Sequence, residues 1–385
     1  MRFQKTITVV GLLMLVFMAT GNWPALAKEP YKIGVVVPIT GVASFLGEPK
    51  RNTAQLIADR VNKGGGINGH PLELVIYDTE SNATKTLLAV KKLIKRDEVL
   101  GIMGPSRSGN AMAVIPTVER FKAPLIAMAA SRKIGAPVDK RKWVFKVVPG
   151  DDLAVRLIYG FMKKKGIRKV ALMTVSSGYG ISGREQLQKL ASQYGIRVVA
   201  DITYGPKESD LTAQLTKARG SGASAIINWS IGPTQILVTR NWKQLGIKIP
   251  LYQSYGFASK RNIELSGGAA EGVILPVARV CVANELDPKD PHYQVATQYK
   301  KLYETKFKSE VNLFGGHAWD AINQFVAALK AVGPDRAKIR DYQENLKNFV
   351  GINGTFNRSP QDHAGLSPDC YVMVQVKDGD WHLLK

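Results

Sequence analysis

Short apolar runs alternate with longer amphipathic stretches over the first third of the chain. The runs are rich in β-branched residues and predict strands, while the stretches between them space their apolar residues as a helix does. The runs are apolar at successive positions, whereas a strand with one face exposed to solvent alternates apolar and polar residues. We therefore expect helices on both sides of the sheet. The order therefore predicts a doubly wound parallel sheet. Its strands begin at Tyr31, Leu72, Val99 and Pro124, and its helices span 50–62, 83–95 and 110–120.

A second series of the same kind follows Val148-Pro149-Gly150. Three helical stretches and a final hairpin come after that series, and the most economical arrangement returns the helices to the first lobe and the hairpin to the second. We therefore predict an α/β protein of two doubly wound lobes with three crossings, near 148–150, 276–279 and 349–354. The expected lobes are 28–148 with 279–349, and 149–278 with 350–385.

The N-terminus predicts export. Arg2 and Lys5 precede an apolar run over 7–18, and a small-residue stretch ends at Ala27. This is the pattern of a signal peptide over residues 1–27, and its apolar run is shorter than the ~20 residues that span a bilayer. No cysteine follows at a lipoprotein position, so we expect a periplasmic protein, cleaved after Ala27, without a lipid anchor.

The chain is strongly basic, with a formal net charge of +22. Such a charge is compatible with binding to nucleic acid or to an anionic surface. However, the Lys and Arg residues are spread along the whole chain, and the densest clusters, 140–142 and 163–165, contain no interleaved aromatic residues. We therefore expect a solvated basic surface without a nucleic-acid partner, and a field that could attract an anionic ligand.

The chain has two cysteines, Cys281 and Cys370. In an oxidising compartment they could form a disulfide, or both could be buried thiols. The sequence does not show whether their Cα atoms lie within ~7 Å of each other. We favour the disulfide slightly.

One motif suggests an enzyme. Residues 178–183 read G-x-G-x-x-G after a predicted strand, and the next strand reaches Asp201, as in dinucleotide-binding proteins. Against an NAD-dependent oxidoreductase stand the export signal and the absence of a twin-Arg leader. The sequence also lacks G-x-S-x-G, H-E-x-x-H and P-loop motifs. We expect no enzyme, no cofactor and no metal site.

The strand ends suggest a binding site. Ligands of open α/β sheets bind beyond the carboxyl ends of the strands. Hydroxyl groups and free N–H groups at helix starts suit an anionic oxygen, and aromatic side chains supply walls for an apolar body. Taken singly, Ser108 and Ser131 could as well be helix caps. The candidate ligand-binding residues are Phe45, Leu46, Ser106, Arg107, Ser108, Ala129, Ala130, Ser131, Tyr179, Trp229, Ser230, Tyr255 and Phe314.

Several segments, in order, resemble the periplasmic binding proteins of branched-chain amino-acid transport. They include TGVASFLG, KGGGINGHPLELVIYDTESN, GIMGPSRSGNAMAVIPTVERFKAPLIAMAAS, GAAEGVIL and HAWDAINQFVAAL. The resemblance covers essentially the whole predicted mature chain. It implies two lobes that close over a ligand and deliver it to an ABC importer.

Carried over by position, the resemblance puts the ligand carboxylate on Ser108, Ala129 and Ser131, with Tyr179 closing from the second lobe. The acid that pairs with an α-ammonium in the family falls at Tyr255, and the aligned segments offer no replacement. An unpaired buried ammonium costs several kcal/mol. We therefore expect a monomeric importer subunit that captures a small carboxylate: an aromatic or aliphatic acid, or else a hydrophobic amino acid. A ligand-sensing module for a signalling receptor is the alternative.

Overall fold

The computed structural model describes residues 28–384, so the predicted signal peptide lies outside the described residues. The first lobe is built on a five-stranded, fully parallel sheet in the order β2-β1-β3-β4-β5. Its strands are β1 (Tyr31–Val37), β2 (Leu72–Asp78), β3 (Gly101–Met103), β4 (Leu125–Ala127) and β5 (Val144–Lys146).

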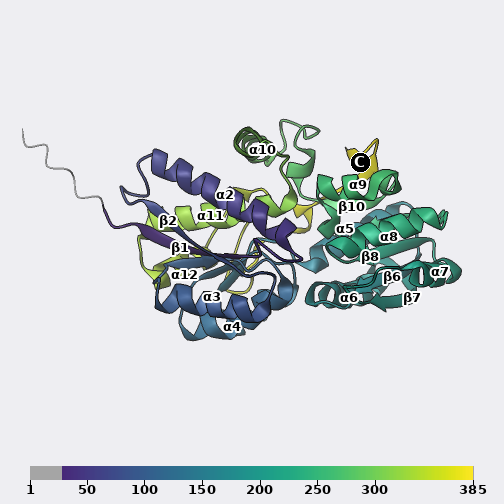
Figure 1. The fold of residues 1–385 in the computed structure, drawn as a ribbon, viewed down its shortest axis with the longest axis horizontal. Coiled ribbons are helices and arrows are strands. Elements are labelled where there is room, and N and C mark those ends of the chain that lie inside the picture. Colours follow the sequence, from purple (N-terminus) through teal and green to yellow (C-terminus); the bar gives the residue numbers. More distant parts are fainter. Residues whose placement is uncertain (1–27, 385) are drawn as a thin grey trace, which may run out of the picture.

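Helices cover both faces of this sheet, as Figure 1 shows. The pair α3 (Ala83–Lys95) and α4 (Ser108–Arg120) packs together, and α2 (Ser44–Lys63) packs along α11 (Leu313–Val332). Of the late helices, α10 (Tyr293–Phe307) precedes α11 in the chain and α12 (Arg336–Glu344) follows it. The apolar side chains of β1, β3 and β4 are fully buried, as expected for strands that are covered on both sides.

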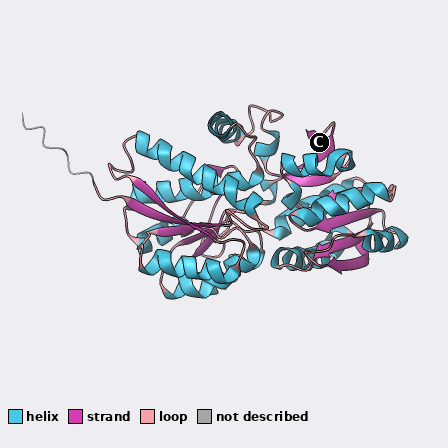
Figure 2. Cartoon of the chain, viewed as in Figure 1, coloured by secondary structure: helices cyan, strands magenta, loops and turns pink. Residues whose placement is uncertain are grey.

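The second lobe is built on a seven-stranded sheet in the order β14-β13-β10-β9-β8-β6-β7 (Figure 2). The first five strands in sequence are parallel, and the final hairpin joins antiparallel beside β10. Its strands are β6 (Lys169–Val175), β7 (Arg197–Tyr204), β8 (Ala225–Trp229), β9 (Leu251–Gln253), β10 (Ile274–Val277), β13 (Val372–Lys377) and β14 (Asp380–Leu383). Its helices are α5 (Asp151–Lys164), α6 (Gly178–Ala191), α7 (Thr212–Gly220), α8 (Pro233–Gln244) and α9 (Lys260–Ser266). The predicted fold class is confirmed.

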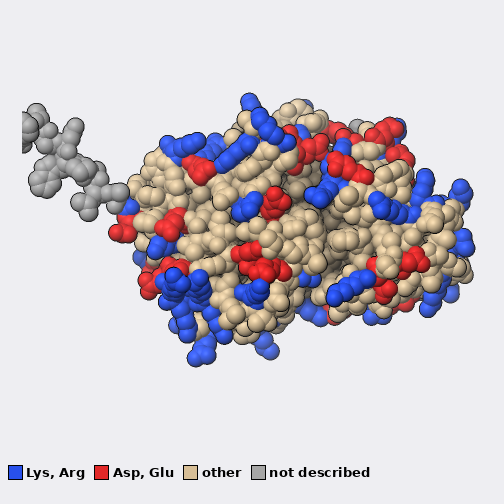
Figure 3. All heavy atoms as spheres, viewed as in Figure 1, with Lys and Arg blue, Asp and Glu red and all other residues tan. Residues whose placement is uncertain are grey.

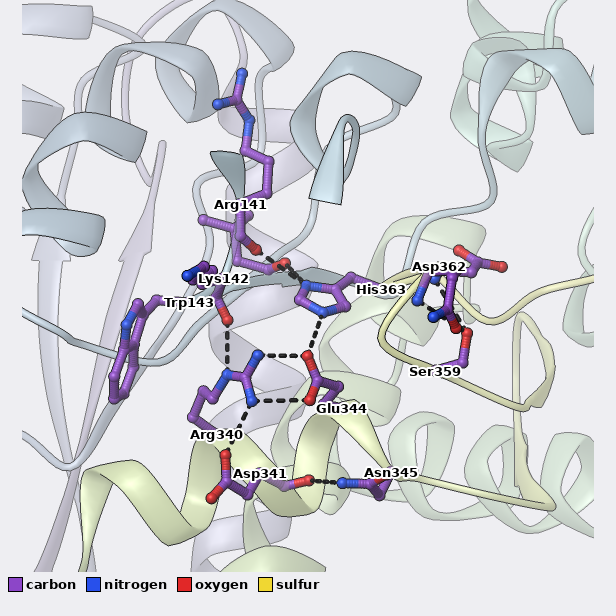
Figure 4. A network of polar contacts seen from close by, with 12 residues as sticks. Arg141, Lys142, Trp143, Arg340, Asp341, Glu344, Asn345, Ser359, Asp362 and His363 are labelled. Carbon is purple, nitrogen blue, oxygen red and sulfur yellow. Dashed lines mark hydrogen bonds and ion pairs between the residues drawn. The ribbon is translucent and has the colours of Figure 1, made fainter. Parts of the chain in front are cut away.

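The segment after α12 stays with the first lobe for longer than we expected. It forms a small hairpin of β11 (Phe349–Gly351) and β12 (Gly354–Phe356), and the Asp320 carboxylate of α11 accepts hydrogen bonds from the backbone N–H groups of Ile352 and Asn353. His363 lies between the carbonyl oxygen of Val144 and the Glu344 carboxylate, in the network shown in Figure 4. We therefore propose a third crossing just before β13, later than 349–354.

The disulfide that we favoured is not formed. Both Cys281 and Cys370 are free. Cys370 is buried against Gly354, where an added β-carbon would lie 3.2 Å from the Cys370 β-carbon. Burial raises the pKa of both thiols above the ordinary value, which keeps them protonated.

Across residues 28–384, helices long and apolar enough to cross a membrane are absent. Acidic and basic side chains interleave over both lobes on the face seen in Figure 3. The basic excess is therefore distributed on this face, in keeping with the spread of Lys and Arg along the sequence.

Candidate ligand-binding site between the lobes

The first lobe presents a pair of serines at the carboxyl ends of β3 and β4. Ser108 is the first residue of α4, and Ser131 precedes a short 3₁₀ helix that begins at Arg132. Both serines are buried, and the N–H of Ser131 donates to the Ser108 hydroxyl over 3.2 Å. Helix starts orient N–H groups toward an anion, so this pair suits one carboxylate group.

Two buried lysines hold the backbone that leads to Ser131. The Lys146 ammonium donates to the carbonyl oxygens of Ala130 and Ser131 at 2.5 and 3.1 Å. The Lys50 ammonium donates to the carbonyl oxygen of Met128 at 2.9 Å. Burial lowers the pKa of Lys146 to about 8 and that of Lys50 to about 7. The two lysine ammonium groups thus hold the backbone of residues 128–131 in place. Their positive charge also favours a negative charge nearby.

The second lobe contributes a buried acid that the sequence analysis missed. Asp151 opens α5, and its two carboxylate oxygens accept from the hydroxyls of Ser182 and Tyr255 at 2.5 and 3.0 Å. The Ser182 hydroxyl also lies 2.9 Å from the Ser131 hydroxyl. Hydrogen bonds therefore run from Ser131 in the first lobe, through Ser182, to Asp151 in the second.

Asp151 lies outside the segments that carry the family resemblance, and it is the acid nearest to position 255 in the second-lobe network. The hydroxyl of Tyr255 lies against Asp151, so an acid stands directly behind this tyrosine. Burial raises the pKa of Asp151 to about 6, although the Ser182 hydrogen bond acts in the opposite direction. An aspartate in the first turn of a helix is common for reasons of the helix dipole alone, so its sequence position gave no signal.

Aromatic side chains form the second-lobe wall. The Tyr255 ring lies 5.7 Å from that of Tyr179, 5.8 Å from that of Trp229 and 5.1 Å from that of Tyr371, between ring centroids. The hydroxyls of Tyr179 and Tyr371 and the indole N–H of Trp229 are buried and have no hydrogen-bond partner within residues 28–384. Such groups are unusual in a protein interior and are expected where a ligand supplies the partner.

The first-lobe wall is formed by Phe45 and Phe314, whose ring centroids lie 5.8 Å apart. The Phe45 ring also reaches the second lobe, because a β-carbon on Gly232 would lie 3.4 Å from it. His317, one turn further along α11, has its ring 6.1 Å from that of Phe314. The first-lobe wall therefore touches the second lobe at Gly232.

Some candidate residues turn away from this arrangement. Arg107 donates to the carbonyl oxygen of Ser81 at 2.6 Å, which anchors a loop of its own lobe. The Ser230 hydroxyl accepts from the side-chain amide of Asn228 inside the second lobe. Leu46 is buried in the same hydrophobic core cluster as Phe314 and Tyr179. Ser106 is buried, and its hydroxyl is unpaired in the described part of the chain.

The glycines of residues 178–183 are explained by packing. A β-carbon on Gly180 would lie 1.8 Å from the carbonyl oxygen of Val175, and one on Gly183 would lie 2.1 Å from the Trp229 indole nitrogen. Asp201, the expected ribose-binding acid, accepts hydrogen bonds from the Arg184 guanidinium at 2.6 to 3.0 Å. Gly180, Gly183 and Asp201 therefore serve the contact of α6 with its own sheet, whereas Gly178 faces Gly109 of the first lobe.

Comparison with known sequences decides the family. The sequence profile described as "Periplasmic binding protein" matches residues 30–380. The chain belongs to the periplasmic binding protein family. It is 24% identical to the leucine-, isoleucine-, valine-, threonine- and alanine-binding protein of Pseudomonas aeruginosa over 269 residues, which is 69% of this chain and 70% of that one. It is 23% identical to Leu/Ile/Val-binding protein homolog 2 of Brucella abortus, over 90% of this chain and 91% of that one.

Solved structures of periplasmic binding proteins share the whole fold. An extracellular ligand-binding receptor from Rhodopseudomonas palustris HaA2 superposes with a TM-score of 0.86 at 26% identity, over 93% of this chain and all of that one. The leucine-binding protein LivK of Thermotoga maritima gives a TM-score of 0.81 at 25% identity, over 92% of this chain and 97% of that one. The resemblance to branched-chain amino-acid binding proteins is thereby confirmed.

Proposed function

We propose that this periplasmic binding protein is the solute-binding subunit of an ABC importer and captures a small carboxylate with an aromatic or aliphatic body. The observation that carries the proposal is the pairing of Ser108 with Ser131 at two adjacent helix starts, facing Ser182 of the other lobe. One carboxylate can accept from both serine hydroxyls at these helix starts. The aromatic walls then surround an apolar body.

Capture works by closure of the two lobes. The ligand carboxylate first binds the serines of the first lobe, and α6 then brings Ser182 and Tyr179 over it. The closed form buries the ligand and is the form that an importer would recognise. Contacts between Ser131 and Ser182, and between Phe45 and Gly232, support closure along this line.

An amine-free acid fits better than an amino acid. The Asp151 carboxylate already accepts hydrogen bonds from two neutral hydroxyls, so it does not require an α-ammonium as a partner. A hydrophobic amino acid is the second candidate. Only the Tyr255 hydroxyl separates Asp151 from the aromatic wall, and the Asp151 carboxylate could compensate the charge of an ammonium group.

A calorimetric panel tests the ligand class. We expect benzoate, phenylacetate or hexanoate to bind more tightly than phenylalanine or leucine, and the corresponding neutral amides to bind least. Leucine binding tighter than every amine-free acid would reject the proposed preference. Absence of binding by any acid or amino acid of the panel would reject the carboxylate site itself.

Replacement of Ser131 tests the position of the carboxylate. Ser131→Ala removes one hydrogen bond to a charged group, worth about 1.5–3 kcal/mol, and should weaken binding of the tightest acid roughly 10- to 100-fold. Ser259→Ala is a suitable control, since Ser259 precedes α9 and its side chain makes no cap hydrogen bond. Equal affinity of the parent and Ser131→Ala would place the carboxylate elsewhere.

A further inference from the structure

Lys50 is a buried cation without an acidic partner. Its side chain is 1% exposed, and within residues 28–384 its ammonium has a single hydrogen bond, to the carbonyl oxygen of Met128. An ammonium has three donors, so two remain unused. A buried charge is costly unless it is paired. Burial lowers the pKa of Lys50, and no carboxylate within the described residues opposes that effect.

Lys146, the other buried lysine of the site, is different. It makes two hydrogen bonds to carbonyl oxygens, and the negative charges of Asp151, Asp152 and Asp362 raise its pKa against the effect of burial. Of the two lysines buried within residues 28–384, the protein thus compensates one with acids of its own. Lys50 lacks this compensation.

His317 lies on the helix that packs against the helix of Lys50. The imidazole is 3% exposed, and both of its nitrogens are buried without a hydrogen-bond partner in the described chain. Burial, and the positive charges of Lys50 and Lys146, lower the pKa of His317 well below its ordinary value. The ring is therefore neutral, with one N–H available to donate to an acceptor that also neutralises Lys50.

This pair lies within reach of the serine pair. Lys50 is bonded to Met128, three residues before Ser131, and three residues of extended chain span at most about 10–11 Å. His317 adjoins Phe314, which adjoins Phe45 at the edge where the lobes meet. Lys50 and His317 therefore lie beside the segment that carries Ser131 and beside the ring of Phe314.

We propose that the ligand is a dianion, whose second acidic group is bound by Lys50 and His317 beside the phenylalanine wall. The proposal rests on the proposed function, because it takes the first carboxylate to lie on Ser108 and Ser131. It narrows the ligand class from small carboxylates to compact diacids with a rigid or apolar spacer. The second acid supplies the partner that Lys50 lacks and accepts the imidazole N–H.

Three ligands that differ only at the far end test the proposal. They are benzoate, benzene-1,4-dicarboxylate and its monoamide 4-carbamoylbenzoate, with hexanoate and hexanedioate as a flexible pair. We expect the aromatic diacid to bind the parent at least about 10-fold more tightly than the monoamide in calorimetric titration, because the two ligands share size and differ in charge. Equal affinities would overturn the second acidic subsite while leaving the proposed function intact.

Variants locate the subsite. Lys50→Met keeps the length of the side chain and should abolish the preference for the diacid over the monoamide, and His317→Phe should reduce it. Lys63→Met removes an exposed lysine from the end of the same helix and should leave the preference unchanged. A preference that survives in Lys50→Met would assign the second acid to another group. If a variant does not fold, the ligand comparison in the parent still decides.

If none of the acids binds the parent, the proposed function fails together with the subsite. If benzoate and hexanoate bind and the diacids bind no better, only the subsite fails. The two outcomes are distinguishable in one set of titrations.

Discussion

Asp151 is linked to the first lobe through the hydroxyl of Ser182. Its carboxylate is fully buried and accepts hydrogen bonds from Ser182 and Tyr255, and Ser182 in turn contacts Ser131. Burial raises its pKa from 3.8 to about 6. The folded protein therefore holds a proton on this group at a pH where the unfolded chain releases it.

The raised pKa predicts a pH-dependent effect of Asp151→Asn. Between pH 4 and pH 6 this carboxyl lowers the stability of the parent as pH rises, because the folded state binds more protons than the unfolded state. The amide does not titrate, so the stability of Asp151→Asn relative to the parent should increase from pH 4.5 to pH 7.5. The raised pKa limits this increase to at most about 3 kcal/mol in the free energy of unfolding. Thermal melts across this range measure the difference, and a difference that is independent of pH would contradict the assignment.

Part of the candidate site could be predicted from the sequence, and part of it could not. Ser108, Ser131, Tyr179 and Tyr255 lie in the short segments that follow strands β3, β4, β6 and β9, and strand ends of a parallel sheet share one edge. Asp151 and Ser182 gain their roles from contacts across the two lobes, which no local pattern encodes. Lys50 lies on a helix that also carries exposed basic residues, so its burial could not be read from its residue type.

At the scale of elements, α6 shows how one sequence pattern can have two physical causes. The glycines that match a dinucleotide motif bring the start of α6 against β6 and Trp229. Prediction of the strand and helix order succeeded because both sheets are covered on two sides and their strands are continuously apolar. The attachment of the small hairpin of β11 and β12 to α11 depends on the buried carboxylate of Asp320, which no local sequence pattern indicates, and it underlies the later third crossing that we propose.

Two glycine substitutions in helices test the packing of α6. In Gly180→Ala the new methyl group would overlap the Val175 carbonyl, so we expect a loss of about 1–3 kcal/mol in the free energy of unfolding. In Gly160→Ala, within α5, the nearest atom is 3.8 Å away, and the variant should gain up to about 1 kcal/mol from helix propensity. Urea unfolding measures both. Equal stability of the two variants would mean that α6 does not need a glycine at this position.

At the scale of the whole molecule, the two lobes are closed upon each other through polar and apolar contacts. The Ser131 and Ser182 hydroxyls meet, the Phe45 ring approaches Gly232, and Arg132 lies 3.8 Å from Asp152 in a partly exposed ion pair. Exposed ion pairs of this kind contribute little to stability. The stability of the closed form should therefore depend mainly on the ligand and on the buried contacts between the lobes. The two-lobe architecture was predictable from the duplicated order of elements, whereas the relative position of the lobes was not.

Small-angle X-ray scattering with a matched acid and amide tests carboxylate capture by closure most directly. The tightest-binding acid of the calorimetric panel and its neutral amide are added to separate samples of the protein. Both are added at the same concentration, which is one that saturates the protein with the acid. We predict that the acid lowers the radius of gyration and that the amide leaves it unchanged. An acid that binds without any change in the radius of gyration, or an amide that produces the same change, would contradict the account.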